Sequence, residues 1–253
     1  MFKQHSTFLG PPDQNVKIWR YLDFTKFVSL LHSGSLWFSR ADKFEDPLEG
    51  SYPRMNIEAR KGHPDIPKEY LPYAKTILEG MSAIRKDWPR YITVNCWHIN
   101  EHESSAMWSI YLKSNEGIAI QSTYNRLKEC FSDTDEDVFI GKVNYIDYEH
   151  QVIENANLYS PFVYKRKSYE HERELRALIV KPPPLGAKGF DFNIDTITAG
   201  INVTVGIQVL IESVYVAPNS PVWFTELVKS VLIKYDCDFP VLQSTLSHTE
   251  PLF

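Results

Sequence analysis

Short apolar runs alternate with polar positions along most of the chain, and this period of two predicts strands. A helical spacing interrupts them where Phe24, Phe27, Val28 and Leu31 follow at i, i+3, i+4 and i+7. Asp23 is placed to cap that helix and Gly34 to end it. Further helices are expected after Ser104 or Ser105, over residues 124–131, and from Ser220–Pro221 to Tyr235. The predicted strands are 17–22, 35–40, 91–99, 117–122, 139–146, 172–180, 201–208, 213–218 and 239–244.

Strands and helices do not alternate regularly, so the pattern favours an α+β fold with mixed, largely antiparallel sheets and flanking helices. No internal repeat, low-complexity tract or linker divides the chain, and we expect a single domain over residues 1–253. Within it, residues 1–16 are expected to be an N-terminal tail and 181–253 the C-terminal part. Residues 51–90, interrupted by several prolines, are expected to be a helical or irregular insertion.

The composition argues against some classes of function. With 253 residues, 43% of them hydrophobic, the chain can bury a sizeable core. A net charge of -5 argues against a broad basic surface for nucleic acid, so a charged ligand must be met by a local site. The N-terminal sequence lacks the apolar core of a secretory signal, and no run approaches the roughly 18 apolar residues of a membrane span. We therefore expect a soluble, cytoplasmic protein with no membrane partner.

Common catalytic motifs are missing, and the metal patterns are weak. The chain contains no G-x-G-x-x-G, P-loop, G-x-S-x-G or H-E-x-x-H motif. His98 and His102, with Glu103, have a metal-like spacing but lie where a strand runs into a loop. The acidic residues 133, 135 and 137 lack the glycine and glutamate of a calcium loop, and the three cysteines have no C-x-x-C spacing. We expect no metal site.

The sequence KSYEHERELRALIV, residues 167–180, can form either of two structures. If a strand runs from residue 172 to 180, Glu172, Glu174 and Arg176 lie on one face, and Arg176 can hold one carboxylate ionised. The same residues also fit a charged helix face, because Glu172 and Arg176 are four apart. We favour the strand, with residues 167–171 as a helical or loop approach. The basic run 165–167 just before it fits either a phosphate contact or an exposed polar face.

Four segments stand out by their chemistry: Trp19-Arg20-Tyr21; Trp37-Phe38-Ser39-Arg40 followed by FEDPLEG (44–50); residues 104–111 with GIAI (117–120); and Glu172-Arg173-Glu174-Leu175-Arg176. In this order they resemble the bacterial domain of unknown function 2971 family, from about Lys17 to Val180. That family in turn resembles the ADP-ribosyltransferase fold. The resemblance implies a split sheet as the core.

The resemblance also implies an activity, with NAD as the substrate. Arg20, Ser39 and Glu172-x-Glu174 would match the three motif positions of that fold, although Ser39 is followed by Arg40 and Ala41 rather than Thr-Ser. Glu174 and Glu172 would then be catalytic, one stabilising an oxocarbenium-like transition state and the other orienting or deprotonating an acceptor. The nucleotide-binding residues would be Arg20, Tyr21, Trp37, Ser39, Tyr111 and Arg176. The acceptor could be a protein, a nucleic acid or a small molecule, and the role that of a toxin or phage-defence effector.

Other readings of the same residues stay open. The protein could be a catalytically inactive nucleotide- or nucleic-acid-binding module, or a metal-dependent hydrolase using Asp46, Glu49 and Glu172. The aromatic residues could simply be core, and Arg20 could pair with Glu172 or Glu174. Asp46, Glu49 and Ser39 also suit loop capping. The oligomeric state is not indicated by any pattern.

Overall fold

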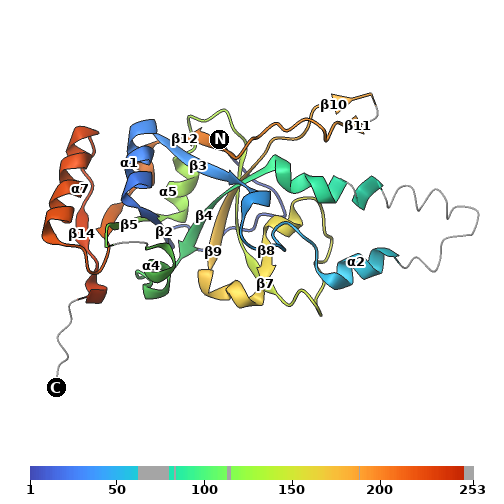
Figure 1. Cartoon of the computed structure of the whole chain (residues 1–253), viewed down its shortest axis with the longest axis horizontal. Helices are drawn as coiled ribbons and strands as arrows, with labels where there is room; N and C mark the ends of the chain where they lie inside the picture. Colours follow the sequence, from blue (N-terminus) through green and yellow to red (C-terminus); the bar gives the residue numbers. More distant parts are fainter. Residues whose placement is uncertain (62–79, 83, 113–114, 188, 248–253) are drawn as a thin grey trace, which may run out of the picture.

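The computed structural model describes residues 1–61, 80–82, 84–112, 115–187 and 189–247. Its centre is a ten-stranded sheet in the order β1-β6-β9-β4-β2-β5-β13-β14, with β3 joined to β4 and β12 to β3 (Figure 1). These strands are β1 (Phe2–Lys3), β2 (Lys17–Asp23), β3 (Ser35–Arg40), β4 (Ile92–Ile99), β5 (Gly117–Thr123), β6 (Val138–Lys142), β9 (Glu174–Val180), β12 (Gly200–Thr204), β13 (Ser213–Val216) and β14 (Val241–Gln243). Only the β1–β6 and β13–β14 pairs of this sheet are parallel. The fold is therefore α+β with a largely antiparallel sheet, as predicted.

One face of the sheet, the helical face, is covered by helices. They are α1 (Phe24–Ser33), α5 (Tyr124–Glu129), α6 (Ile207–Leu210) and α7 (Val222–Lys234). Their apolar side chains form the largest core cluster together with alternate residues of β9, namely Leu175, Ala177 and Ile179. Figure 1 shows α1 and α7 side by side, and the rings of Phe24 and Phe224 lie 5.3 Å apart.

The opposite face, which we call the cleft face, is covered by shorter elements. The helix α4 (Ser105–Tyr111) packs Met107 and Trp108 against Trp19 and Tyr21 of β2. The 3-10 segments η3 (Trp88–Tyr91) and η4 (Ser160–Phe162) contribute Trp88 and Phe162 to a second cluster that includes Leu178 of β9. Glu174 and Arg176 alternate with the buried apolar residues of β9 and so point to this face.

The sheet forks at β4. One edge of β4 pairs with β9 from Ile92 to His98. The other edge pairs with β2 at Ile99 and His98, and with β3 at Val94 and Thr93. Between these two ladders the side-chain amide of Asn95 donates to Trp37 O at 2.9 Å. We call the gap at residues 95–97, between β2 and β3, the fork; it is the split expected for the core.

Local signals account for the best-predicted elements. The Asp23 carboxylate accepts from the Lys26 N–H at 2.8 Å and caps α1, which ends at Gly34 with φ +59°. The predicted strand 139–146 is instead two strands, β6 and β7 (Asn144–Ile146), because Val143 N–H bonds Glu174 O while Asn144 N–H bonds Val163 O. β7 pairs with β8 (Tyr164–Arg166) outside the main sheet.

Three other expectations change in the structure. The strand predicted over 201–208 ends at Thr204, and residues 207–210 form α6. The strand predicted from 172 begins at Glu174, since Glu172 ends the 3-10 segment η5 (Lys167–Glu172). The strand predicted over 239–244 shortens to β14.

The flanking segments are ordered around the sheet. The expected N-terminal tail contributes β1, which runs parallel to β6, and buries Phe8 against Gly141. In the expected insertion, α2 (Arg54–Lys61) and η3 are helical, whereas residues 62–79 and 83 lie outside the described residues. The hairpin of β10 (Leu185–Gly186) and β11 (Gly189–Phe190) projects from the sheet. Among the described residues, no helix is long and apolar enough to cross a membrane.

Candidate functional site

The two carboxylates of the sequence motif meet at one lysine. Glu174 begins β9 and is 6% exposed, while Glu172 lies at the end of η5. Arg173 between them has a left-handed backbone, φ +40°, which turns the chain and breaks the expected alternation. Lys165 Nζ lies 2.5 Å from Glu172 Oε2 and 3.7 Å from Glu174 Oε2. The carboxylates therefore converge, although they do not share a strand face.

A row of alternating charges continues from this lysine into the protein. Arg176 Nη2 lies 3.0 Å from Glu174 Oε2, and the Arg176 guanidinium also binds the carboxylate of Glu49. We call Glu49, Arg176, Glu174, Lys165 and Glu172 the charge chain. Arg176 is 1% exposed and its contacts are all internal. Its charge acts on Glu174, and a contact of Arg176 with nucleotide stays a prediction.

The two carboxylates differ in acidity because their surroundings differ. Burial alone would raise the pKa of Glu174, but the charges of Arg176 and Lys165 outweigh it and lower that pKa. Burial raises the pKa of Glu172, and the contact with Lys165 only partly offsets it. Glu174 is thus held ionised, while Glu172 is the better proton acceptor. Carboxylate pairs with separated pKa values are typical of acid–base sites.

Arg20 lies at the fork of the sheet. Its Nη1 donates to Cys96 O at 3.0 Å, and its guanidinium lies 5.9 Å from the centre of the Trp97 ring. Burial lowers the pKa of Arg20, and only the nearby Cys96 and Tyr111 oppose this shift. In the described part of the chain, no carboxylate forms an ion pair with Arg20, so the possible pairing with Glu172 or Glu174 is not found. A partly buried cation without a counter-ion favours an anionic ligand.

Tyr111 connects Arg20 with the carboxylates. Desolvation raises the pKa of its hydroxyl, Cys96, Glu174 and Glu172 raise it further, and Arg20 lowers it, which places the hydroxyl among these groups. The ring of Tyr111 stacks on Tyr21 at 6.5 Å and is 47% exposed. The Tyr21 hydroxyl accepts from Ser104 N–H at 2.7 Å and serves the start of α4. Tyr111 thus presents a half-exposed ring that is stacked on Tyr21.

Trp37 and Ser39 lie on the other branch of the fork. Trp37 Nε1 donates to Ser39 Oγ at 3.0 Å, and the indole is 44% exposed. Ser39 pairs with Val94, which pairs with Leu178, so Ser39 shares the cleft face with Glu174. Leu178 is four residues along β9 from Glu174, or about 13 Å. The structure therefore gathers Arg20, Tyr111, Glu172 and Glu174, but leaves Trp37 and Ser39 at a distance.

Cys96 and Tyr145 were not singled out by the sequence patterns, and His98 was considered only as a metal ligand. Cys96 of β4 lies beside Glu174 and Arg20, and burial together with the charge of Glu174 raises the pKa of its thiol. Tyr145 Oη accepts from Glu174 N–H at 2.8 Å. His98 Nδ1 lies 2.6 Å from Glu172 O and ties the turn to β4. The alternation of residues 91–99 could have placed Cys96 and His98 on the face of Glu174, but only the strand order shows that β4 is the neighbour.

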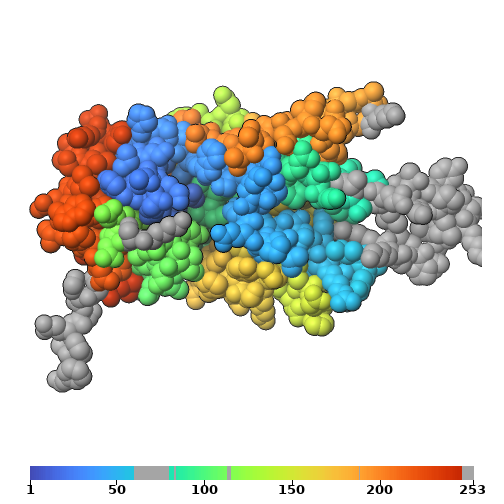
Figure 2. All heavy atoms as spheres, viewed as in Figure 1, coloured from blue at the N-terminus to red at the C-terminus, as the bar shows by residue number. Residues whose placement is uncertain are grey.

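The FEDPLEG loop, residues 44–50, belongs to the site rather than to a separate turn. Figure 2 shows the light-blue segment that contains it lying against the yellow segment near residue 170. Asp46 Oδ1 accepts from Leu48 N–H at 3.0 Å, as expected for loop capping, and also binds Arg166 Nη2 at 2.7 Å. Glu49 does not use its carboxylate for capping, because both oxygens bind Arg176. Among the described residues, no group of three or more His, Cys, Asp or Glu side chains is arranged to hold a metal ion.

Comparisons with known proteins give a distant structural likeness. No family model and no curated protein matches the chain, so the resemblance to the family of unknown function stays a prediction. Among solved structures, the chain is similar to DarT of Thermus sp. 2.9 in complex with NAD+, at 10% identity and a TM-score of 0.41, covering 95% of this chain and all (100%) of that one. The complexes of DarT with carba-NAD+ and with ADP-ribosylated ssDNA match at 10% and 12% identity, each with a TM-score of 0.37, over 92% and 93% of this chain and 96% of theirs. These TM-scores are too low to carry residue roles from those proteins to this chain.

Proposed function

We propose that the protein binds NAD+ at the fork and transfers its ADP-ribose to an acceptor. The observation that carries the proposal is Arg20, a partly buried guanidinium without a carboxylate partner among the described residues, near Tyr111, whose hydroxyl pKa is raised by Glu174 and Glu172. A pyrophosphate would supply the missing negative charge, and a guanidinium matches its oxygens in two-point contacts. A ribose attached to that pyrophosphate could then reach the carboxylates.

The charge states of the two glutamates suit the two halves of the reaction. The bond between C1′ of the ribose and the nicotinamide nitrogen breaks, and its electron pair leaves with nicotinamide. Ionised Glu174 would accept a hydrogen bond from a ribose hydroxyl and stabilise the positive charge that develops on the sugar. A lone pair of the acceptor forms the new bond to C1′, and Glu172 would take the acceptor's proton.

The half-exposed ring of Tyr111 would stack on the nicotinamide or the adenine, since its other face is supported by Tyr21. Trp37, also half exposed, would contact the far end of the dinucleotide from the other branch of the fork. Ser39 would assist through its hydrogen bond with Trp37. These roles for Trp37 and Ser39 require the ligand to extend along the cleft face.

Nicotinamide release from NAD+ tests the proposal. We expect the wild type to release nicotinamide in the presence of a competent acceptor, and Glu174→Gln to lose roughly a hundredfold or more of the rate. Arg20→Lys should weaken NAD+ binding, because lysine cannot make the two-point contact. Glu212→Gln is the matched control. Glu212 forms a partly buried ion pair with Lys17, with Nζ and Oε1 2.6 Å apart, and this pair is separate from the charge chain. Equal rates for wild type and Glu174→Gln would contradict the proposal.

The acceptor is defined by parallel assays with protein, nucleic acid and small-molecule candidates. The acceptor class is the one to which radiolabelled ADP-ribose is transferred. The labelling should depend on Glu172. A role as a toxin or phage-defence effector in the cytoplasm predicts that expression in bacteria arrests growth, and that Glu174→Gln relieves the arrest.

One observation favours a second function, that of a nucleotide-binding module without catalysis. Glu174 is already held between two cations, Arg176 and Lys165, and a substrate must compete with them. A pure binding module would show thermal stabilisation by NAD+ or ADP-ribose without nicotinamide release. In that case Arg20→Lys would reduce the stabilisation, whereas Glu174→Gln would leave it unchanged.

A further inference from the structure

The side chain of Asn95 joins the two branches of the fork. Asn95 lies in β4, is 1% exposed, and uses both ends of its amide. Its Nδ2 donates to Trp37 O of β3 at 2.9 Å, and its Oδ1 accepts from Trp97 Nε1 at 2.7 Å. The backbone ladder between β3 and β4 ends at Ser39, so the bond from Asn95 takes the place of strand pairing at Trp37. The amide thereby fixes Trp37 relative to Trp97.

Trp97 in turn supports Arg20. The Arg20 guanidinium lies over the Trp97 ring, 5.9 Å from its centre, and a cation at this distance is attracted to the ring face. The indole is 2% exposed, and a rotation of its ring would break the bond to Asn95. Because Asn95 holds the ring on which Arg20 rests, it acts on Arg20 through one intervening side chain.

Arg20 keeps hydrogen-bond donors for a ligand. Its Nη1 donates to Cys96 O at 3.0 Å, and within the part of the chain that the structure describes this is its hydrogen bond to the protein. A guanidinium has five donors, so those at Nε and Nη2 remain for a pyrophosphate. Their direction depends on how the guanidinium lies on Trp97, and therefore on Asn95.

We propose that Asn95 is a positioning residue that holds Arg20 and Trp37 in fixed places on the two branches of the fork, so that both can contact one nucleotide. The contact with nucleotide rests on the proposed function, whereas the fixing of Arg20 and Trp37 does not. A site whose donors are already in place loses less freedom when the ligand binds, and so binds it more tightly.

Two substitutions of Asn95 separate its two bonds. Asn95→Leu keeps a similar volume and removes both bonds, so that the buried Nε1 of Trp97 is left without its acceptor. Asn95→Asp keeps an acceptor for Trp97 but turns an oxygen toward Trp37 O, which repels it and releases β3. The first variant therefore frees the ring under Arg20, and the second frees the branch that carries Trp37.

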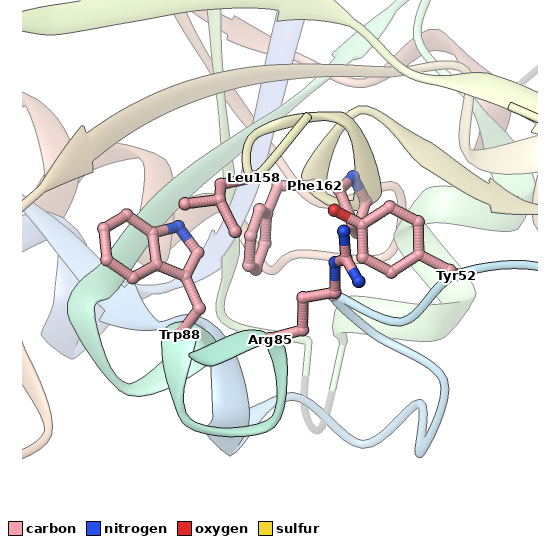
Figure 3. A pocket seen from close by; sticks show the side chains of 7 residues that line it. Tyr52, Arg85, Trp88, Leu158 and Phe162 are labelled. Atoms are coloured by element: carbon pink, nitrogen blue, oxygen red, sulfur yellow. The ribbon is translucent and has the colours of Figure 1, made fainter. Parts of the chain in front are cut away.

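A small recess beside the FEDPLEG loop is not expected to hold the same ligand. It has a volume of about 160 Å³, and its lining includes Tyr52, Arg85, Trp88 and Phe162 (Figure 3). Pockets that enclose larger organic ligands have about 300–1,000 Å³. Since Arg85 brings a second guanidinium, 5.4 Å from the Tyr52 ring, Arg85→Lys is a control for the place where pyrophosphate binds.

The experiment first follows the protein without ligand. The Nε–H signal of Arg20 is recorded by NMR of 15N-arginine-labelled protein and assigned with Arg20→Lys, and hydrogen exchange of the Trp97 indole is assigned with Trp97→Phe. In Asn95→Leu we expect the indole to exchange at least about tenfold faster and the Arg20 signal to move, because both lose a fixed ring. In Asn95→Asp the indole should exchange as in the wild type, while the amides of residues 35–40 exchange faster.

Binding of ADP-ribose is then measured by calorimetry, at a temperature at which every variant is folded. We expect Kd to rise roughly tenfold in Asn95→Leu and in Asn95→Asp, and to stay unchanged in Arg85→Lys. A purely structural role would lower the melting temperature of both Asn95 variants and leave Kd and the Arg20 signal as in the wild type.

An unmoved Arg20 signal in Asn95→Leu overturns the inference. If that variant does not fold, Asn95→Asp must show the faster amide exchange over residues 35–40, and unchanged exchange there overturns it equally. If the wild type binds ADP-ribose but releases no nicotinamide from NAD+, the proposed transfer fails while Kd still decides the role of Asn95. If the wild type binds no ADP-ribose, the proposed function fails, and the measurements without ligand decide that role.

Asn56→Leu is the matched control. Asn56 of α2 also uses both ends of its amide, since Nδ2 donates to Ile153 O at 2.9 Å and Oδ1 accepts from Ile153 N–H at 2.8 Å. These bonds lie outside the fork. We expect Asn56→Leu to lose stability, with the Arg20 signal and the Kd for ADP-ribose as in the wild type. A change as large as that in Asn95→Leu overturns the assignment to Asn95.

Discussion

Replacing Arg176 by methionine tests whether the charge chain stabilises the fold. Arg176 is 1% exposed and contacts both oxygens of Glu49, Phe162 O and Glu174 Oε2 at 2.6 to 3.0 Å. Methionine fills much of the space, yet it leaves two carboxylates buried without the cation between them. Removing one partner of a buried ion pair costs about 3–5 kcal/mol. Against a total stability of about 5–15 kcal/mol, this is a large fraction.

The loss should depend on pH in a defined direction. In the wild type the pKa of Glu174 is lowered, so its contribution to stability is present above its unfolded value near 4.5 and is lost as the pH falls through the folded pKa. In Arg176→Met, burial is no longer offset by the guanidinium and raises the pKa of Glu174. Its ionised form then opposes folding at neutral pH, and protonation relieves the cost. The difference between variant and wild type should therefore shrink from pH 7 to pH 5.

Urea unfolding followed by the fluorescence of the six tryptophans measures this difference at both pH values. At this chain length we expect a melting temperature lowered by roughly 10 °C at pH 7. Arg54→Met is the matched control, because Arg54 pairs with Glu58 and Glu149 at the surface and should leave the midpoint unchanged. A loss below about 1 kcal/mol at pH 7, or the same loss at pH 5, would refute the role of Arg176 as the internal counter-ion.

Two further substitutions test the β3–β12 pair and the role of His98. A Cβ at Gly200 would lie 2.3 Å from Phe38 O and 2.6 Å from the Trp37 ring, so Gly200→Ala should open the β3–β12 pair and cost roughly 2 kcal/mol, whereas Gly80→Ala, in open space, should cost nothing measurable. Burial lowers the pKa of His98 below its ordinary 6.5, so its contribution to stability is present above 6.5 and is lost as the pH falls through the folded pKa. Urea unfolding of His98→Gln should therefore show a smaller loss of stability on acidification than that of the wild type. Parallel curves of stability against pH for the two proteins would exclude a contribution of His98 to the pH dependence.

The elements that could be predicted are those with local causes. The alternation of β2, β4 and β5 and the caps of α1 depend on neighbours a few residues away, and they appear near their expected bounds. Glu172 was misplaced because its backbone depends on Arg173, whose φ of +40° is unusual for a residue with a side chain. Distant contacts hold this turn: Ile99 N–H bonds Arg173 O at 2.9 Å, and His98 binds Glu172 O. No spacing within residues 167–180 carries that information.

The sequence alone determined most of the strand and helix pattern, the α+β class and the chemical types at the site, including the paired glutamates and Arg20. Only the tertiary structure decided that Arg176 faces Glu49, 127 positions away in the chain, and that Arg20 lies at the fork without a counter-ion among the described residues. The physical reason is that these interactions depend on distance in space and not on separation along the chain. Desolvation and Coulomb interactions act over a few ångströms, so the ionisation of Glu174 depends on whichever charges the strand order brings beside it.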